Sequence, residues 1–143
     1  MCSIAGIIPF KNKTDLSKIY SITNSIDHRG PDQKKIFKSK NSVFGFVRLK
    51  IIDLSDNSNQ PFSSYDNKVH IIYNGEIYNF RDLKNEFFLN EKFKSKGDGE
   101  IILHLYLKFG INFIEKIKGM FSIAIIDERK NKTYLIRDRF GIK

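Results

Sequence analysis

The sequence has one cysteine in 143 residues and no tryptophan. A single cysteine cannot form an internal disulfide bond, which is typical of proteins that work in a reducing compartment such as the cytoplasm. The three histidines, His28, His70 and His104, are scattered and have no cysteine partner at the spacing of a zinc site. We therefore expect a cytoplasmic protein without a metal site.

Long apolar runs are absent as well. No apolar run reaches the roughly 18 residues that a membrane-spanning helix needs, so we expect no membrane partner. The apolar start of the chain, residues 2–10, is too short for a secretory signal, and Lys11 interrupts it. The sequence also lacks a glycine-rich phosphate-binding loop. We expect no cofactor in this chain and no binding of ATP.

The formal net charge of +9 raises the possibility of a nucleic-acid partner. However, 19 of the 25 basic residues are lysine, and the two halves of the chain, 1–72 and 73–143, carry +5 and +4. The sequence has neither a dense arginine stripe nor an aromatic and basic RNA-binding motif. Most of the basic side chains are therefore interpreted as part of a solvated surface, and no nucleic-acid partner is expected.

Short apolar segments separated by polar turns predict one α+β domain over residues 1–143, with antiparallel sheets covered by helices. Strands are predicted at residues 3–8, 35–38, 42–53, 69–73, 120–127 and 132–137, and a loop at 56–67. Helices are predicted at 15–28, 80–89 and 99–109, with a short one at 111–117. The expected helix caps are Thr14 or Asp15, Asn79 and Asp98, and Gly110 is the expected left-handed stop. The first helix is expected to bury Leu16, Ile19, Tyr20 and Ile26.

The first candidate catalytic residue is Cys2. If Met1 is removed, the thiol and the α-amine belong to the same terminal residue. An α-amino group titrates at about 7.7–8.0 and a thiol at about 8.5, so the amine can accept the thiol proton near neutral pH. One residue would then supply both nucleophile and base. The alternative is that Cys2 is a small apolar residue at the start of a strand.

Asn74-Gly75 follows a predicted strand and allows two interpretations. Asn-Gly strongly favours a type I′ hairpin turn. Alternatively, the Asn74 side-chain amide and the Gly75 N–H form an oxyanion hole, where glycine lets a substrate approach closely. The residues alone leave both possibilities open.

Charged side chains near these positions could hold an amino-acid substrate. Arg48 could bind a carboxylate through two hydrogen bonds, or it could lie on an exposed strand position facing away from Val47. Asp98 could hold an ammonium group or cap a helix. Glu76 could do the same as Asp98, or pair with a surface lysine.

Eight motifs follow one another along the chain. They are residues 1–7, 28–32, 48–53, 60–62, 73–79, 97–103, 119–122 and 137–143, and they include Met1-Cys2-Ser3, Arg29-Gly30-Pro31-Asp32, Gln60-Pro61-Phe62, Asn74-Gly75-Glu76 and Gly97-Asp98-Gly99. In this order they resemble the glutaminase half of asparagine synthetase. The resemblance covers the whole chain and implies a class II glutamine amidotransferase domain of the N-terminal-nucleophile hydrolase type.

That family has a four-layer αββα sandwich of two antiparallel sheets between helices. By similarity, Cys2 attacks the side-chain amide of glutamine, and Asn74 and Gly75 hold the oxyanion. Arg48 binds the α-carboxylate of the substrate, Asp98 and Glu76 hold its α-amine, and Ile52 lines the pocket. The implied products are ammonia and glutamate.

The sequence departs from the family pattern in two places. Gly97 stands where many relatives have serine. The family also continues with further strands and a synthetase domain that uses ATP and magnesium, so we expect a C-terminally truncated domain whose partner is such a domain or subunit. An open sheet edge could also allow a homodimer. The alternatives are a catalytically silent docking module and a basic nucleic-acid binder.

Overall fold

The structure is a computed structural model that describes residues 2–9, 15–40 and 42–143. Its strands are β1 (Ser3–Ile7), β2 (Gln33–Lys38), β3 (Val43–Arg48), β4 (Phe62–Ser63), β5 (Val69–Ile77), β6 (Gly119–Asp127) and β7 (Lys132–Arg137). Its α-helices are α1 (Ile19–Ser25), α2 (Phe80–Phe87) and α3 (Glu100–Phe109), and short 3₁₀ helices lie at Leu16–Lys18, Asp27–Arg29, Asp56–Ser58 and Gly110–Glu115. No helix in these described ranges is both long and apolar enough to cross a membrane.

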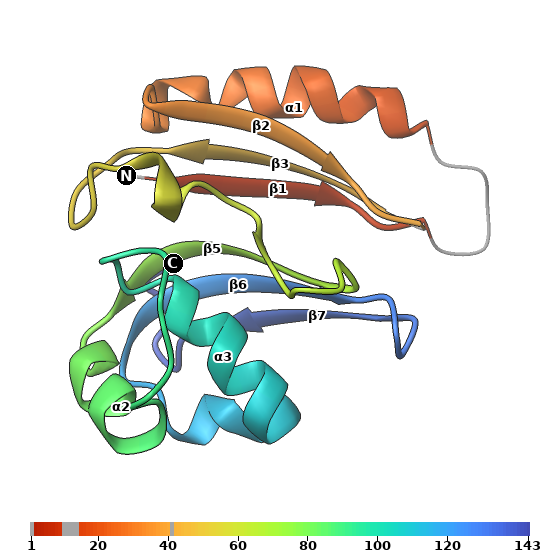
Figure 1. The fold of residues 1–143 in the computed structure, drawn as a ribbon. Coiled ribbons are helices and arrows are strands. Elements are labelled where there is room, and N and C mark those ends of the chain that lie inside the picture. Colours follow the sequence, from red (N-terminus) through yellow and green to blue (C-terminus); the bar gives the residue numbers. More distant parts are fainter. Residues whose placement is uncertain (1, 10–14, 41) are drawn as a thin grey trace.

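The elements form four layers (Figure 1). Helix α1 covers an antiparallel sheet of order β1-β3-β2, and this sheet faces a second antiparallel sheet of order β4-β5-β6-β7. Helices α2 and α3 cover the outer face of the second sheet. This arrangement confirms the predicted αββα sandwich. Strand β7 is an edge strand of the described sheet, and the homodimer suggested by an open edge stays a prediction.

Strand β3 is buried along its whole length because both of its faces are covered. Phe44 and Phe46 pack against Ile72, Ala124 and Ile126 of the second sheet. Val43, Gly45 and Val47 point the other way, toward α1, because side chains alternate along a strand. The interpretation of Arg48 as an exposed strand residue is therefore wrong, since it is only 5% exposed.

The buried face of α1 differs from the predicted one. Ile19 is buried as expected, but Tyr20 is 53% exposed and Leu16 is also exposed, whereas Thr23 is fully buried. The reason is Gly45, where a Cβ atom would lie 1.8 Å from Thr23 Oγ1. The glycine leaves space for a polar side chain, and the Thr23 hydroxyl donates to the Ile19 carbonyl at 2.7 Å.

The chain enters and leaves this helix through short 3₁₀ turns. Asp15 caps the opening turn by accepting from the Ser17 N–H at 3.0 Å, which confirms one of the two predicted caps, while Thr14 lies outside the described residues. The closing 3₁₀ turn is Asp27–Arg29, so the helical segment ends at Arg29, one residue later than predicted.

Several strand boundaries were predicted wrongly. Strand β2 begins at Gln33, β3 stops at Arg48 instead of residue 53, and the predicted loop at 56–67 contains β4. The largest error concerns β5, which continues through Asn74-Gly75 and pairs with β6 at nine positions. This long ladder outweighs the local turn preference of Asn-Gly, and it excludes the type I′ hairpin. Glycine is required here because a Cβ atom on Gly75 would lie 2.1 Å from the Met120 carbonyl oxygen.

The second core lies between the β4–β7 sheet and helices α2 and α3, and it contains Ile71, Ile77, Leu83, Ile101, Leu105, Phe113, Ile123 and Ile125. Helix α2 ends at Phe87, two residues earlier than predicted; Asn79 occupies the N-cap position as predicted, but its side chain forms no capping hydrogen bond. Asn79 instead bridges Lys116 O and Lys118 N at 2.9 and 2.8 Å. Gly110 ends α3 as predicted and has the positive φ of 60° that favours glycine, but its ψ of −148° lies outside the left-handed helical conformation.

Candidate active site

A pocket of about 130 Å³ lies at the end of the sandwich where β3 ends and the loop before α3 begins. Roughly 10–15 Å³ of such space holds one water molecule, so the pocket is large enough for a small ligand. Its lining residues are Cys2, Arg48, Leu49, Ile51, Ile52, Asp53, Ser58, Gln60, Phe62, Tyr73, Gly75, Glu76, Gly97, Asp98 and Gly99. The structure therefore brings together six of the seven predicted site residues, and Asn74 is the one outside the lining.

Cys2 lies at the start of β1, half-buried at the edge of the layer between the two sheets. Its Sγ is 3.7 Å from the Leu49 carbonyl oxygen, and its side chain packs against the cluster of Phe44, Phe46 and Ile72. Asn74 follows Ile72 by two residues on β5, so its side chain points toward the same side of the sheet. The thiol and the Asn74 amide thus share the layer between the sheets.

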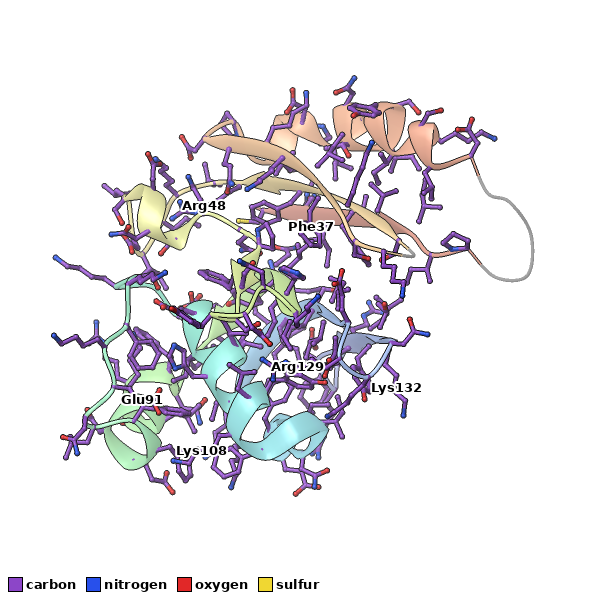
Figure 2. All side chains as sticks on the ribbon, turned by 45° about the vertical axis from the view of Figure 1, so that its right-hand side comes forward. Phe37, Arg48, Glu91, Lys108, Arg129 and Lys132 are labelled. Atoms are coloured by element: carbon purple, nitrogen blue, oxygen red, sulfur yellow. The ribbon has the colours of Figure 1, made fainter. Side chains whose placement is uncertain are left out.

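Arg48 is the last residue of β3, and its guanidinium is held by the loop that follows (Figure 2). Nη1 donates to the Ser55 carbonyl at 3.1 Å and to Asn59 Oδ1 at 2.8 Å, and Nη2 donates to the Asp53 carbonyl. These bonds use three of the five N–H groups of the guanidinium. Arg48 is thereby fixed in one orientation at the pocket wall.

The backbone of Arg48 is braced from the other side by the Arg29-Gly30-Pro31-Asp32 segment. Asp32 donates its N–H to the Arg48 carbonyl at 3.0 Å, and its carboxylate accepts from the Lys50 N–H at 2.7 Å. A Cβ atom on Gly30 would lie 2.5 Å from the Arg48 nitrogen, so glycine allows this close approach. The motif is thus a backbone support for the strand end that carries Arg48.

Asp98 is buried and does not cap α3, so the predicted capping role is wrong. Its Oδ2 accepts from the Tyr73 hydroxyl at 2.5 Å and from the Ile77 N–H at 2.7 Å, which draws the side chain toward β5. No described protein group donates to Oδ1, and this oxygen is not fully buried, so it is open to the pocket. Burial and the Asp98 charge raise the pKa of Tyr73, which therefore remains a hydrogen-bond donor.

Glu76 and Ile52 both lie at the mouth of the pocket. Glu76 is exposed and, among the described residues, forms no ion pair, so the alternative of a surface lysine partner finds no support there. Ile52 is 45% exposed and lies in the loop after β3. Within residues 2–9, 15–40 and 42–143, no group of three or more histidine, cysteine, aspartate or glutamate side chains could hold a metal ion.

Gln60, for which the sequence predicted no role, is a buried structural part of the pocket wall. Gln60 is buried, and its side-chain amide pairs with the Tyr73 backbone, with Oε1 accepting from Tyr73 N at 2.6 Å and Nε2 donating to Tyr73 O at 2.9 Å. The Gln60 side chain thus pairs with the backbone of β5 as a neighbouring strand would. The motif Gln60-Pro61-Phe62 was the only signal, and the spacing of residues alone gives no reason for this contact.

A second structural residue that was missed is Asp138, in the motif at the chain's C-terminal end. Its buried carboxylate accepts from the backbone N–H groups of Phe121, Phe140, Ile142 and Lys143 at 3.0–3.2 Å. Burial alone would raise the pKa of Asp138, but these N–H groups outweigh it and hold the pKa below its ordinary value. The motif therefore ties the last residues to β6.

His104 on α3 lies beside Glu100, the carboxylate that holds the segment leading to Asp98. Its Nδ1 lies 2.7 Å from Glu91 Oε2 and its Nε2 3.8 Å from Glu100 Oε1, and Glu100 also accepts from the Lys94 and Ser95 N–H groups. Burial lowers the pKa of His104, but the bonds to Glu100 and Glu91 outweigh burial and raise it above 6.5. The positive form of His104 therefore holds both carboxylates.

This raised pKa predicts a pH-dependent stability. The contribution of His104 to the free energy of unfolding is fully present below the pKa of about 6.5 that it has in the unfolded chain. This contribution is lost as the pH rises through the higher pKa of the folded state. His104→Gln should therefore lower the melting temperature more at about pH 5.5 than at about pH 8.5, by roughly 2 °C, because partly exposed ion pairs contribute little. Thermal unfolding at the two pH values measures this difference.

His70→Gln is the matched control, since burial lowers the pKa of His70. The neutral form of His70 is favoured in the folded state, so protonation of His70 at acidic pH destabilises the wild-type protein. His70→Gln should therefore lower the melting temperature less at about pH 5.5 than at about pH 8.5, which is the opposite trend. The same trend in both variants would contradict the assignment of His104.

Comparison with known proteins identifies the family. A family model described as "Glutamine amidotransferase domain" matches residues 1–143. The chain is 44% identical over 147 residues to the glutamine-hydrolysing asparagine synthetase 2 of Bacillus subtilis, covering 100% of this chain and 19% of that protein. It is 36% identical over 147 residues to asparagine synthetase B of Escherichia coli, covering 99% of this chain and 26% of that protein.

Solved structures agree on the fold. The glutamine phosphoribosylpyrophosphate amidotransferase of B. subtilis superposes with a TM-score of 0.59 at 23% identity, over 72% of this chain and 24% of that chain. The chain thus spans about a quarter or less of the length of the relatives named above. The family match extends over the whole of residues 1–143, and so this chain belongs to the glutamine amidotransferase domain family.

Proposed function

We propose that this domain hydrolyses glutamine to glutamate and ammonia, with Cys2 as the nucleophile after removal of Met1. The observation that carries this proposal is one pocket lined by a thiol, an arginine and two carboxylates, Cys2, Arg48, Glu76 and Asp98. A thiol supplies a nucleophile, and the charged groups match the two charges of an α-amino acid.

In the proposed reaction the α-amine of Cys2 accepts the thiol proton, and the thiolate attacks the amide carbon of glutamine. The C–N bond then breaks, the leaving nitrogen takes a proton, and ammonia departs from a thioester. Water attacks the thioester, which releases glutamate and regenerates the thiol. Every atom comes from glutamine, water and Cys2, so no further reactant is needed.

Asn74 and Gly75 are proposed to stabilise the oxyanion of the tetrahedral intermediates. The Asn74 side chain points to the layer between the sheets, as Cys2 does, and Gly75 lines the pocket. The close pairing of Gly75 with β6 fixes the local backbone, which supports the proposal of donors that need no rearrangement when substrate binds. One such donor typically contributes about 2.7–4 kcal/mol to the transition state.

Arg48 is proposed to bind the α-carboxylate, and Asp98 with Glu76 the α-ammonium group. Asp98 suits this role because one carboxylate oxygen is already bound by Tyr73 and Ile77 while the other faces the pocket. Ile52 is proposed to line the side of the substrate. These contacts would select an amide that carries both α-substituents over a simple amide.

The named synthetases are several times longer than this chain. We propose that the ammonia passes to an ATP-dependent synthetase domain or subunit, which would also hold ATP and magnesium, for a reaction of the asparagine-synthetase type. The domain itself is proposed to need no cofactor and to work in the cytoplasm.

The direct test is intact mass followed by a glutamate-release assay. We expect the purified chain to begin at Cys2 and to release glutamate and ammonia in equal amounts from glutamine. A chain that retains Met1 and shows no turnover, yet binds a separate synthetase domain, would favour the catalytically silent docking module instead.

A further inference from the structure

Two loops form opposite walls of the pocket. The loop after β3 supplies the carbonyls of Asp53 and Ser55 and the Asn59 side chain that hold the Arg48 guanidinium. The loop before α3 carries Asp98. The two loops are far apart in sequence and approach each other at the same end of the sandwich (Figure 1). Their separation fixes the distance between the positive and negative groups of the site.

The Asp53 carboxylate joins these two loops. Its Oδ1 accepts from the Ser55 N–H at 2.9 Å, within its own loop. Its Oδ2 accepts from the Ser58 hydroxyl at 2.7 Å and from the Lys96 N–H at 2.8 Å, across 43 residues of sequence. Among the described residues, the bond to Lys96 is the one hydrogen bond that links the loop of Arg48 to the loop of Asp98.

The surroundings of the Asp53 carboxylate suit this bridging role. Asp53 is 6% exposed, and no basic side chain forms an ion pair with it in the described parts of the chain. Burial alone would raise its pKa, but the hydrogen bonds from Ser55, Ser58 and Lys96 outweigh burial and hold the pKa far below its ordinary value. A buried charge held only by neutral donors depends on every one of them, so the geometry of both loops is coupled through it.

We propose that Asp53 is a positioning residue that sets the spacing between Arg48 and Asp98 and thereby matches the pocket to the α-carboxylate and α-ammonium groups of one amino acid. The inference rests on the proposed function, because it concerns the same substrate. Asp53 acts through the two loops and takes no part in the chemistry at Cys2.

Asp53→Asn tests the proposal because an amide has one acceptor oxygen, so the bridge to Ser55 and the bridge to Lys96 cannot both be kept. A misplacement of about 1 Å can cost about 10²-fold in rate, and we expect KM for glutamine to rise about tenfold with a smaller change in kcat. The selectivity for glutamine over 4-carbamoylbutanoate, which lacks the α-amino group, should fall by a similar factor.

Asp127→Asn is the matched control. Asp127 is also buried, and its carboxylate also accepts from a hydroxyl, Tyr106 at 2.7 Å, and from a backbone N–H, Lys130 at 3.1 Å, but it does not line the pocket. This variant should lose stability without a change in selectivity. Ser58→Ala removes one donor to Asp53 and keeps the bond to Lys96, so it should show a smaller shift in the same direction and serves if Asp53→Asn does not fold.

Hydrogen exchange separates this inference from the proposed function. Asp53→Asn should speed amide exchange in both segments, 53–59 and 94–99, whether or not glutamine is turned over. Faster exchange confined to 53–59, or unchanged selectivity in an active Asp53→Asn variant, would overturn the inference. Failure of the proposed function would instead appear as a wild-type domain that releases no glutamate.

Discussion

Cys2→Ala is expected to abolish glutamate release from glutamine, with a loss of at least about 10⁴-fold in kcat, because Cys2 is the one cysteine of the sequence. The two hydroxyl groups that also line the pocket, those of Ser58 and Tyr73, are held as donors to Asp53 and Asp98. The variant keeps the α-amine, the pocket and the charged groups, so it should still bind glutamine. The measurement is steady-state glutamate release together with glutamine binding by calorimetry. Binding without turnover is the combination that identifies a nucleophile.

Ser3→Ala is the matched control for this variant. Ser3 is buried in β1, and its side chain points to the face opposite Ile4 and away from the layer that contains Cys2. It should retain wild-type kcat. Wild-type turnover in Cys2→Ala, or turnover by a chain that retains Met1, would rule out the terminal-thiol mechanism.

Asp98→Asn is expected to raise KM for glutamine strongly while leaving the fold intact. The amide oxygen of asparagine can replace Oδ2 and accept from Tyr73 and Ile77, and the amide nitrogen then takes the place of Oδ1, which faces the pocket. A donor would thus meet the substrate ammonium group. Hydrogen bonds to charged groups contribute about 1.5–3 kcal/mol, so kcat/KM should fall by about 10- to 100-fold.

The control is again Asp127→Asn, because Asp127 accepts a buried tyrosine hydroxyl in the same way as Asp98 but lies outside the pocket. Similar losses of kcat/KM in both variants would indicate general destabilisation rather than substrate binding. For 4-carbamoylbutanoate, wild type and Asp98→Asn should differ little, since this analogue has no ammonium group. An undiminished effect on the analogue would argue against the ammonium role.

The local sequence predicted the architecture well because its apolar pattern alternates along the strands and repeats along the helices. The closing hairpin of β6 and β7 and the stop at Gly110 agree with the prediction. The errors occur where a distant partner changes the local preference. Asn74-Gly75 remains in a strand because β6 pairs with it, and Thr23 is buried because Gly45 leaves space opposite it.

The same distinction applies to the site. The sequence singled out Cys2, Arg48, Glu76 and Asp98 by their chemistry, and all four line one pocket. It could not show that Arg48 is held by carbonyl groups of its own loop, or that Asp98 turns toward Tyr73 instead of capping α3. Backbone carbonyl and N–H groups are the same in every residue, so a sequence does not reveal which of them a side chain will meet.

The sequence by itself determined which reactive and charged groups the domain has, and their order along the chain. Only the tertiary structure decided their separation, because that depends on hydrogen bonds between segments such as the loop of Asp53 and the loop of Lys96. Composition and periodicity reflect local energetics, whereas the distance between two walls of a pocket is fixed by contacts between residues that are remote in the chain.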